Sequence, residues 1–133
     1  MKGLDTNVLV RYLTQDDPAQ AETATRAIEN AAESGDKLVI QPVVLFERVR
    51  VLDSAYGFKK DAIVATIERI LRTAQFQVAD KDIVWQAFTD YRAGTGDFSD
   101  HYIGRANARD GAETTLTFDK SLRGDTRFEM LGA

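Results

Sequence analysis

Four carboxylates stand where the local sequence pattern does not require an acid, and they are Asp5, Glu47, Asp100 and Asp119. If these side chains meet in space, their charges need a cation to coexist, because neighbouring carboxylates repel one another. Oxygen ligands of this kind suit Mg²⁺ or Mn²⁺. The chain has no cysteine and one histidine, which excludes thiolate zinc sites and disfavours sites built on histidine. We therefore expect any metal here to be a hard cation held by oxygen.

Two of the acids, Asp5 and Asp119, each follow directly after a predicted strand. The first strand is a short apolar stretch that ends at Leu4, and the second spans 115–118. In open parallel α/β sheets, ligands bind beyond the carboxyl ends of the strands, so both acids are expected at the mouth of a site. Each acid also fits a purely structural role, as the N-cap of the helix or turn that follows it.

The other two acids lie on predicted helices. Glu47 belongs to the helix after Pro42, which is apolar nearly all round, and a carboxylate on such a face is costly unless it is paired or bound to a cation. Its structural alternative is an ion pair with Arg50, three residues further on. For Asp100 the alternative is a capping box with Asp97 at the start of its helix. The joint pattern is much less probable by chance than any one of its members.

Short strands that alternate with helices position these acids, and this order predicts a parallel sheet covered on both faces. The expected strands are a first one ending at Leu4 and others at 38–40, 76–78, 115–118 and 128–130. The expected helices are 8–13, 19–32, 42–54, 60–72, one from Asp80 or Asp82 to Tyr91, and 99–109, with a turn or short helix at 119–122.

The composition is that of an ordinary globular domain, with 133 residues, 44% apolar and 29% charged. No apolar run approaches the length of a membrane span, and Asp5 interrupts the N-terminus before a signal peptide could form. We therefore expect a cytoplasmic protein with no membrane partner. The net charge of −4 argues only mildly against a nucleic-acid partner, because acids gathered around a metal would account for it.

A family resemblance rests on four motifs taken together. In order and spacing they resemble the PIN domain, and most closely the VapC toxins of bacterial type II toxin–antitoxin pairs. The motifs are Asp5-Thr6-Asn7-Val8-Leu9, the Glu47 helix after Pro42, Asp97-Phe98-Ser99-Asp100 and Thr117-Phe118-Asp119. The resemblance implies one domain over residues 1–133, with a three-layer α/β/α fold around a short, mainly parallel five-stranded central sheet.

The resemblance also implies a Mg²⁺-dependent endoribonuclease, with Mn²⁺ as a substitute metal, that cuts structured RNA such as tRNA or ribosomal RNA. The four acids named above would be both the catalytic residues and the metal ligands. Supporting roles would fall to Asp97, Thr6, Asn7 and Thr117. Proteins of the VapC type usually form homodimers and are held inactive by a VapB-type antitoxin, so both partners are expected here.

Basic residues near the acids are candidates for holding RNA. Arg105 and Arg109 lie four residues apart on one predicted helix, and Lys120 and Arg123 follow the last strand-end acid. The structural alternative for each is a solvated basic face.

Three residues depart from the family pattern. Arg48 interrupts an apolar stripe, and the sequence leaves open a subunit interface, the antitoxin or RNA as its contact. Arg50 lies where an ion pair with Glu47 would compete with a metal for this carboxylate. His101 follows Asp100, and we expect it to be structural because a lone histidine is more often a core residue than a ligand.

Three other classes fit the sequence less well: a second enzyme class, a receiver domain and a non-catalytic binding module. A haloacid-dehalogenase-like phosphatase needs a second acid two residues after Asp5, where Asn7 stands. A receiver domain needs a mid-chain phosphoacceptor, for which the stretch ending at Asp80 is a poor match. A PIN-like module that only binds partners would lack one of the site acids, and none is missing.

Overall fold

Turn and capping residues set the boundaries of the elements. Pro18 begins one helix after Asp17, whose side chain accepts a hydrogen bond from the backbone of Gln20, and Pro42 begins another after Gln41. The computed structural model describes residues 1–132. The chain divides into two compact units, unit 1 (Met1–Ala79) and unit 2 (Asp80–Ala133).

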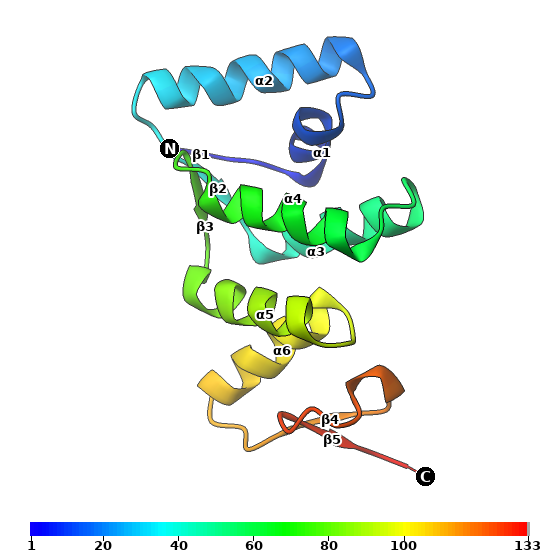
Figure 1. Ribbon diagram of the computed structural model, residues 1–133. Coiled ribbons are helices and arrows are strands. Elements are labelled where there is room, and N and C mark those ends of the chain that lie inside the picture. The colour runs from blue at the N-terminus through cyan, green and yellow to red at the C-terminus, as the bar shows by residue number, and fades with distance from the viewer. Residues whose placement is uncertain (133) are drawn as a thin grey trace. The chain divides into compact units, whose positions relative to one another are not determined.

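Unit 1 combines a parallel sheet with helices (Figure 1). The strands run in the order β1 (Lys2–Gly3), β2 (Leu38–Ile40) and β3 (Phe76–Val78). Lys2 lies opposite Leu38, which in turn lies opposite Phe76. The helices are α1 (Thr6–Thr14), α2 (Pro18–Glu33), α3 (Pro42–Ser54) and α4 (Lys60–Arg72).

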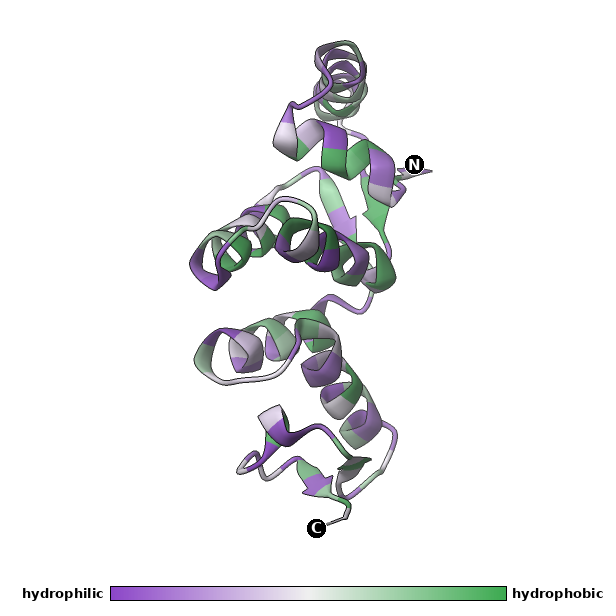
Figure 2. Ribbon diagram, turned by 90° about the vertical axis from the view of Figure 1, so that its right-hand side faces the viewer, coloured by the Kyte–Doolittle hydropathy of each residue, from purple (hydrophilic) through white to green (hydrophobic). Residues whose placement is uncertain are grey.

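The core of unit 1 forms where the apolar stripes of these helices meet the sheet. Ile40 of β2, Leu9 of α1 and Leu45 of α3 are completely buried, and Ile67 and Ile70 of α4 are almost so. Helix α1 packs against α2 and α3, and α3 packs against α4. Figure 2 shows hydrophobic and hydrophilic residues interleaved along the helices, as amphipathic helices require.

Unit 2 pairs two helices with a short sheet. Its elements are α5 (Lys81–Ala93), α6 (Phe98–Arg109), β4 (Thr115–Thr117), the 3₁₀ turn η1 (Lys120–Leu122) and β5 (Phe128–Met130). Strands β4 and β5 are parallel, with Thr115 opposite Phe128. Gly104 of α6 allows a close approach to β5, because a Cβ atom there would lie 2.8 Å from Cζ of Phe128. Phe88 and Phe98 are buried in the core between α5 and α6.

The structure confirms the α/β class and the predicted elements, most of them within two residues of the expected bounds. Strands β1 to β5 all pair in parallel, as expected, and within the described residues they divide into a three-stranded and a two-stranded sheet. The single domain over residues 1–133 stays a prediction. No helix in the described part of the chain combines the length and the apolar character needed to cross a membrane.

Candidate functional site

Asp5 stands at the carboxyl end of β1 and begins α1. Its Oδ1 atom accepts a hydrogen bond of 3.0 Å from the backbone N–H of Val8, so the helix-capping interpretation of Asp5 is confirmed. The other carboxylate oxygen, Oδ2, accepts no hydrogen bond from residues 1–132, and the side chain is exposed. Capping therefore fixes the direction of the carboxylate and leaves one oxygen for a ligand.

Glu47 of α3 is held by Thr6, the residue next to Asp5. The Thr6 hydroxyl donates a hydrogen bond of 3.0 Å to Oε2 of Glu47, which joins the first turn of α1 to the middle of α3. The expectation that Glu47 lies on a costly apolar face is wrong, because Glu47 is exposed and its neighbour Val43 is 55% exposed. Among the described residues Glu47 forms no ion pair with Arg50. Unit 1 thus carries two exposed carboxylates, one of which is hydrogen-bonded to the residue that follows the other.

Arg48, the residue after Glu47, is the charged residue of α3 that faces the core of unit 1. Its side chain is only 2% exposed, and neither Nε nor Nη1 has a hydrogen-bond partner within residues 1–132. Burial lowers the pKa of this guanidinium, against the opposing influence of nearby Tyr56 and Asp16. Arg48 is therefore a buried and incompletely hydrogen-bonded component of the core of unit 1, and its side chain does not form part of an exposed binding surface.

Asp97 and Asp100 form the predicted capping box at the start of α6. The backbone N–H of Asp97 donates to Oδ2 of Asp100 at 3.3 Å. Partial burial raises the pKa of Asp100 above its ordinary value, and the negative charges of Asp97 and Asp119 raise it further, although the hydrogen bond from Asp97 opposes them. Asp100 therefore caps α6 as predicted, and its carboxylate also lies near the carboxylates of Asp97 and Asp119.

Asp119 is the second strand-end acid, and it caps η1. Its Oδ1 accepts hydrogen bonds from the backbone N–H and the hydroxyl of Ser121, at 2.9 and 2.7 Å. Its own N–H donates to the hydroxyl of Thr117 at 3.0 Å. The bonds from Ser121 lower the pKa of Asp119, and the nearby Asp100 side chain lowers it further.

The side chains of Asp100 and Asp119 are the best place to ask whether the residues of this chain suit a divalent cation. The two carboxylates are within hydrogen-bonding reach, and the pKa of Asp100 is raised partly by the charge of its partner. Such a pair favours any positive group that relieves the repulsion between its members. The donors are all oxygens, which is the set that Mg²⁺ and Mn²⁺ prefer. The residues present therefore fit a hard divalent metal.

The loop before α6 brings these two acids together. His101 is buried, and its Nε2 lies 2.7 Å from the carbonyl oxygen of Thr95, while the Thr95 hydroxyl donates to the carbonyl of Ser121. Gly96 has a φ of +91°, and a Cβ atom there would lie 2.5 Å from Cδ2 of Leu122. These contacts hold the loop against η1. They confirm that His101 is structural, as expected.

Asp90 of α5 is the centre of an ion-pair cluster that the sequence pattern did not predict. Its side chain is 8% exposed and accepts hydrogen bonds from Nε and Nη2 of Arg105 at 2.6 and 2.9 Å, with Nη2 of Arg127 at 3.2 Å. Burial raises the pKa of Asp90, but the two arginines outweigh it and the net pKa is lowered. No short-range pattern could reveal this cluster, because its members are separated by 15 or more residues.

The basic residues expected to hold RNA differ in how they are engaged. Arg105 is committed to Asp90, and Arg109 forms ion pairs with Asp110 at 3.2 Å and Asp80 at 3.5 Å. Lys120 and Arg123 are exposed beside Asp119, and neither forms an ion pair with any residue in the range 1–132. Asn7 is exposed on the first turn of α1.

The candidate acids thus form two sets, each within its own unit. Unit 1 presents Asp5 with Glu47, and unit 2 presents Asp97 and Asp100 with Asp119. Over the described residues, no three His, Cys, Asp or Glu side chains are grouped as a ready-made metal site. The convergence of all four predicted ligands stays a prediction.

Comparison with known proteins gives two matches. The sequence pattern of the PIN domain family matches residues 3–124, a range that includes every candidate acid. A curated relative, the VapC ribonuclease of Aquifex aeolicus (strain VF5), is 28% identical over 132 residues. The alignment covers 99% of this chain and 93% of the relative.

Proposed function

The chain belongs to the PIN domain family, and we propose that it is a metal-dependent endoribonuclease toxin of the VapC type. The observation that carries the proposal is the pairing of the Asp100 and Asp119 carboxylates, at the start of α6 and after β4, each of which influences the pKa of the other. A residue that only caps a helix does not need a second acid beside it, whereas a cation site does. The proposed substrate is structured RNA, such as tRNA or ribosomal RNA.

Four carboxylates are proposed as metal ligands and catalytic groups: Asp5, Glu47, Asp100 and Asp119. Each of the three aspartates has one oxygen committed to a backbone N–H, which fixes its orientation before a metal arrives. Mg²⁺, or Mn²⁺ in its place, would polarise a phosphoryl oxygen and lower the pKa of a bound water. Hydrolysis by water would leave a 5′-phosphate and a 3′-hydroxyl.

The residues of this chain would then position the groups and move the proton. Asp119, whose pKa is lowered, stays ionised and is suited to accept a proton from the attacking water, and Glu47 is the other candidate for that role. Thr6 orients Glu47 through its hydroxyl, and Thr117 orients the backbone at Asp119. Asp97 fixes Asp100 through the capping box.

Exposed cations beside Asp119 would hold the RNA backbone. Lys120 and Arg123 are the preferred candidates, because Arg105 and Arg109 already form ion pairs within unit 2. Contacts of this kind bind phosphate without reading sequence. A VapB-type antitoxin and a second copy of this chain are the proposed protein partners, and the proposed RNA substrates place its action in the cytoplasm.

The test is cleavage of tRNA and ribosomal RNA by the purified protein in Mg²⁺ and in EDTA. The wild type should cut RNA only with the metal, and Asp100→Asn should lose at least about 100-fold in rate, since one carboxylate ligand is removed. Asp53→Asn, at an exposed acid near the end of α3, is the matched control and should retain full activity. Equal cleavage in EDTA, or no cleavage at all, would contradict the proposal.

A further inference from the structure

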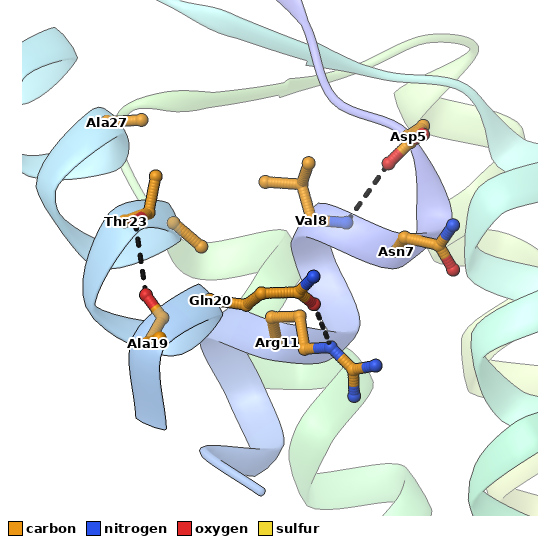
Figure 3. A pocket seen from close by; sticks show the side chains of 9 residues that line it. Asp5, Asn7, Val8, Arg11, Ala19, Gln20, Thr23 and Ala27 are labelled. Carbon is orange, nitrogen blue, oxygen red and sulfur yellow. Dashed lines mark hydrogen bonds between the residues drawn. The ribbon is translucent and has the colours of Figure 1, made fainter. Parts of the chain in front are cut away.

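Unit 1 has a groove of about 460 Å³ between α1 and α2 (Figure 3). Val8 of α1 and Ala24 and Ala27 of α2 give it apolar walls. Asp5 lies at one end, and Gln20 and Arg11 lie together at the other. This is the volume of a site for a small ligand group, and it begins at an acid proposed to act on the scissile phosphate.

We propose that this groove holds the nucleobase next to the scissile phosphate, and that Gln20 reads the edge of that base. The inference deepens the proposed ribonuclease function and rests on it. A nucleobase has apolar faces and a polar edge, which match apolar walls that end in an amide. Because hydrolysis by water does not use the ribose 2′-hydroxyl as the nucleophile, the choice of substrate has to come from binding contacts of this kind.

Arg11 fixes the direction in which the Gln20 amide presents its groups. Nε of Arg11 lies 2.6 Å from Oε1 of Gln20, and because Nε can only donate, the atom that it meets must be the amide oxygen. The Nε2 group of Gln20 is left on the side of Val8, as Figure 3 shows, with no acceptor among the described residues. Gln20 is therefore a donor toward the groove.

Arg11 is itself anchored, so this direction does not depend on one contact. Its Nη1 lies 3.0 Å from Oδ1 of Asp16, which also accepts a hydrogen bond from the Thr14 hydroxyl at 2.9 Å. Hydrogen bonds from Tyr56 and Thr14 lower the pKa of Asp16 to about 2, so its charge persists at neutral pH. A fixed donor selects bases that present a carbonyl oxygen or an unprotonated ring nitrogen over bases that present an amino group.

The floor of the groove leaves room for a flat ring. Ala24 is buried, while Thr23 and Ala27 are exposed, and none of these three lining side chains is bulky. Thr23 donates its hydroxyl to the carbonyl of Ala19 within the same helix, so it presents its methyl group as further apolar surface. Filling this space with a large side chain would exclude a base without disturbing the core.

The experiment uses the full chain and a library of random-sequence RNA oligonucleotides, cut in Mg²⁺ and sequenced at the new ends. The wild type should show a base preference at one position flanking the cut. Gln20→Glu keeps the contact with Arg11 but replaces the donor with an acceptor, and it should shift that preference by at least about fivefold toward bases with an amino group. Gln86→Glu, on the exposed face of α5, should shift nothing.

A second variant does not depend on hydrogen bonding. Ala27→Trp should raise KM at least about tenfold with a smaller effect on kcat, whereas Ala32→Trp, exposed on the same helix outside the groove, should leave both unchanged. If the wild type cuts RNA and both groove variants match it in preference and KM, the inference is overturned and the ribonuclease proposal stands. If Ala27→Trp weakens only binding of a VapB-type antitoxin, the groove is a protein-docking surface and the inference is also overturned. A wild type that cuts no RNA overturns both proposals.

Discussion

The carboxylates of Asp100 and Asp119 are close enough to influence each other's ionisation, and their pKa values are displaced in opposite directions. Partial burial and neighbouring charge raise the pKa of Asp100, while hydrogen bonds from Ser121 lower that of Asp119. As the pH falls, Asp100 is therefore the first of the two carboxyls to take up a proton when no metal is bound, as expected for coupled acids in unequal surroundings. A divalent cation would take the place of that proton.

The coupling predicts how one acid responds when the other is neutralised. Asp119→Asn removes a negative charge beside Asp100, so the pKa of Asp100 should fall, although burial will keep part of the elevation. Carboxyl ¹³C NMR titration of the metal-free protein measures this directly. Asp53→Asn should leave the titration of Asp100 unchanged, and a rise in the pKa of Asp100 in Asp119→Asn would refute the coupling.

The partly buried ion pair of Asp90 with Arg105 should be a principal source of stability in unit 2. Asp90→Asn weakens hydrogen bonds to two charged arginines and should reduce the free energy of unfolding by about 1.5–3 kcal/mol. Asp110→Asn, in an exposed pair, should leave it nearly unchanged. Urea unfolding followed by circular dichroism gives the comparison, and equal effects of the two substitutions would contradict it.

The same pair predicts a pH dependence of stability. Because the folded-state pKa of Asp90 is depressed, its stabilisation is present above the unfolded value of about 3.9 and is lost as the pH falls through the lower folded value. The stability difference between wild type and Asp90→Asn should therefore shrink on acidification below about pH 4. A difference that grew in acid would show that the sign is wrong.

Replacing Arg48 should make the protein more stable. The guanidinium is 2% exposed and two of its nitrogens have no hydrogen-bond partner in the described structure, so its burial costs free energy that a methionine would not. Arg48→Met should raise the free energy of unfolding by about 1–3 kcal/mol. Arg50→Met, at an exposed position two residues away, should change it by less than about 0.5 kcal/mol. Destabilisation by Arg48→Met would reveal a partner for this arginine.

Replacing Gly104 with alanine, which adds only a Cβ atom, should reduce the free energy of unfolding. Glycine to alanine within a helix normally stabilises by about 1 kcal/mol, but here the new Cβ would lie 2.8 Å from the ring of Phe128. Gly104→Ala should instead cost about 1–3 kcal/mol through overpacking. The double variant with Phe128→Leu should recover part of the loss, which a thermal unfolding cycle would detect. Additive losses would mean that the two residues do not press on each other.

Local patterns predicted the elements well because the signals are local. Proline at the start of α2 and α3 and the capping box of α6 are all set by residues within one helical turn. The strand-end acids Asp5 and Asp119 were found for the same reason, since each follows directly after a short apolar run.

Contacts between residues far apart in the sequence could not be predicted from local sequence patterns. The helix of Glu47 and Arg48 is apolar on most sides, so the sequence could not tell which of the two faces the core, and the structure buries Arg48. The partnership of Asp90 with Arg105 depends on how α5 packs against α6, which no spacing encodes. Arg105 was consequently proposed for RNA, whereas the structure shows it in an ion pair.

Metal binding tests the central claim most directly, because it does not require the RNA target to be known. Calorimetric titration of the wild type with Mn²⁺ should show saturable binding, and Asp5→Asn and Asp100→Asn should each weaken it at least about tenfold, as expected when a charged ligand is lost. Asp53→Asn should bind like the wild type. If the wild type binds no divalent cation, or if binding survives both substitutions unchanged, these carboxylates do not form a metal site and the proposed nuclease mechanism is wrong.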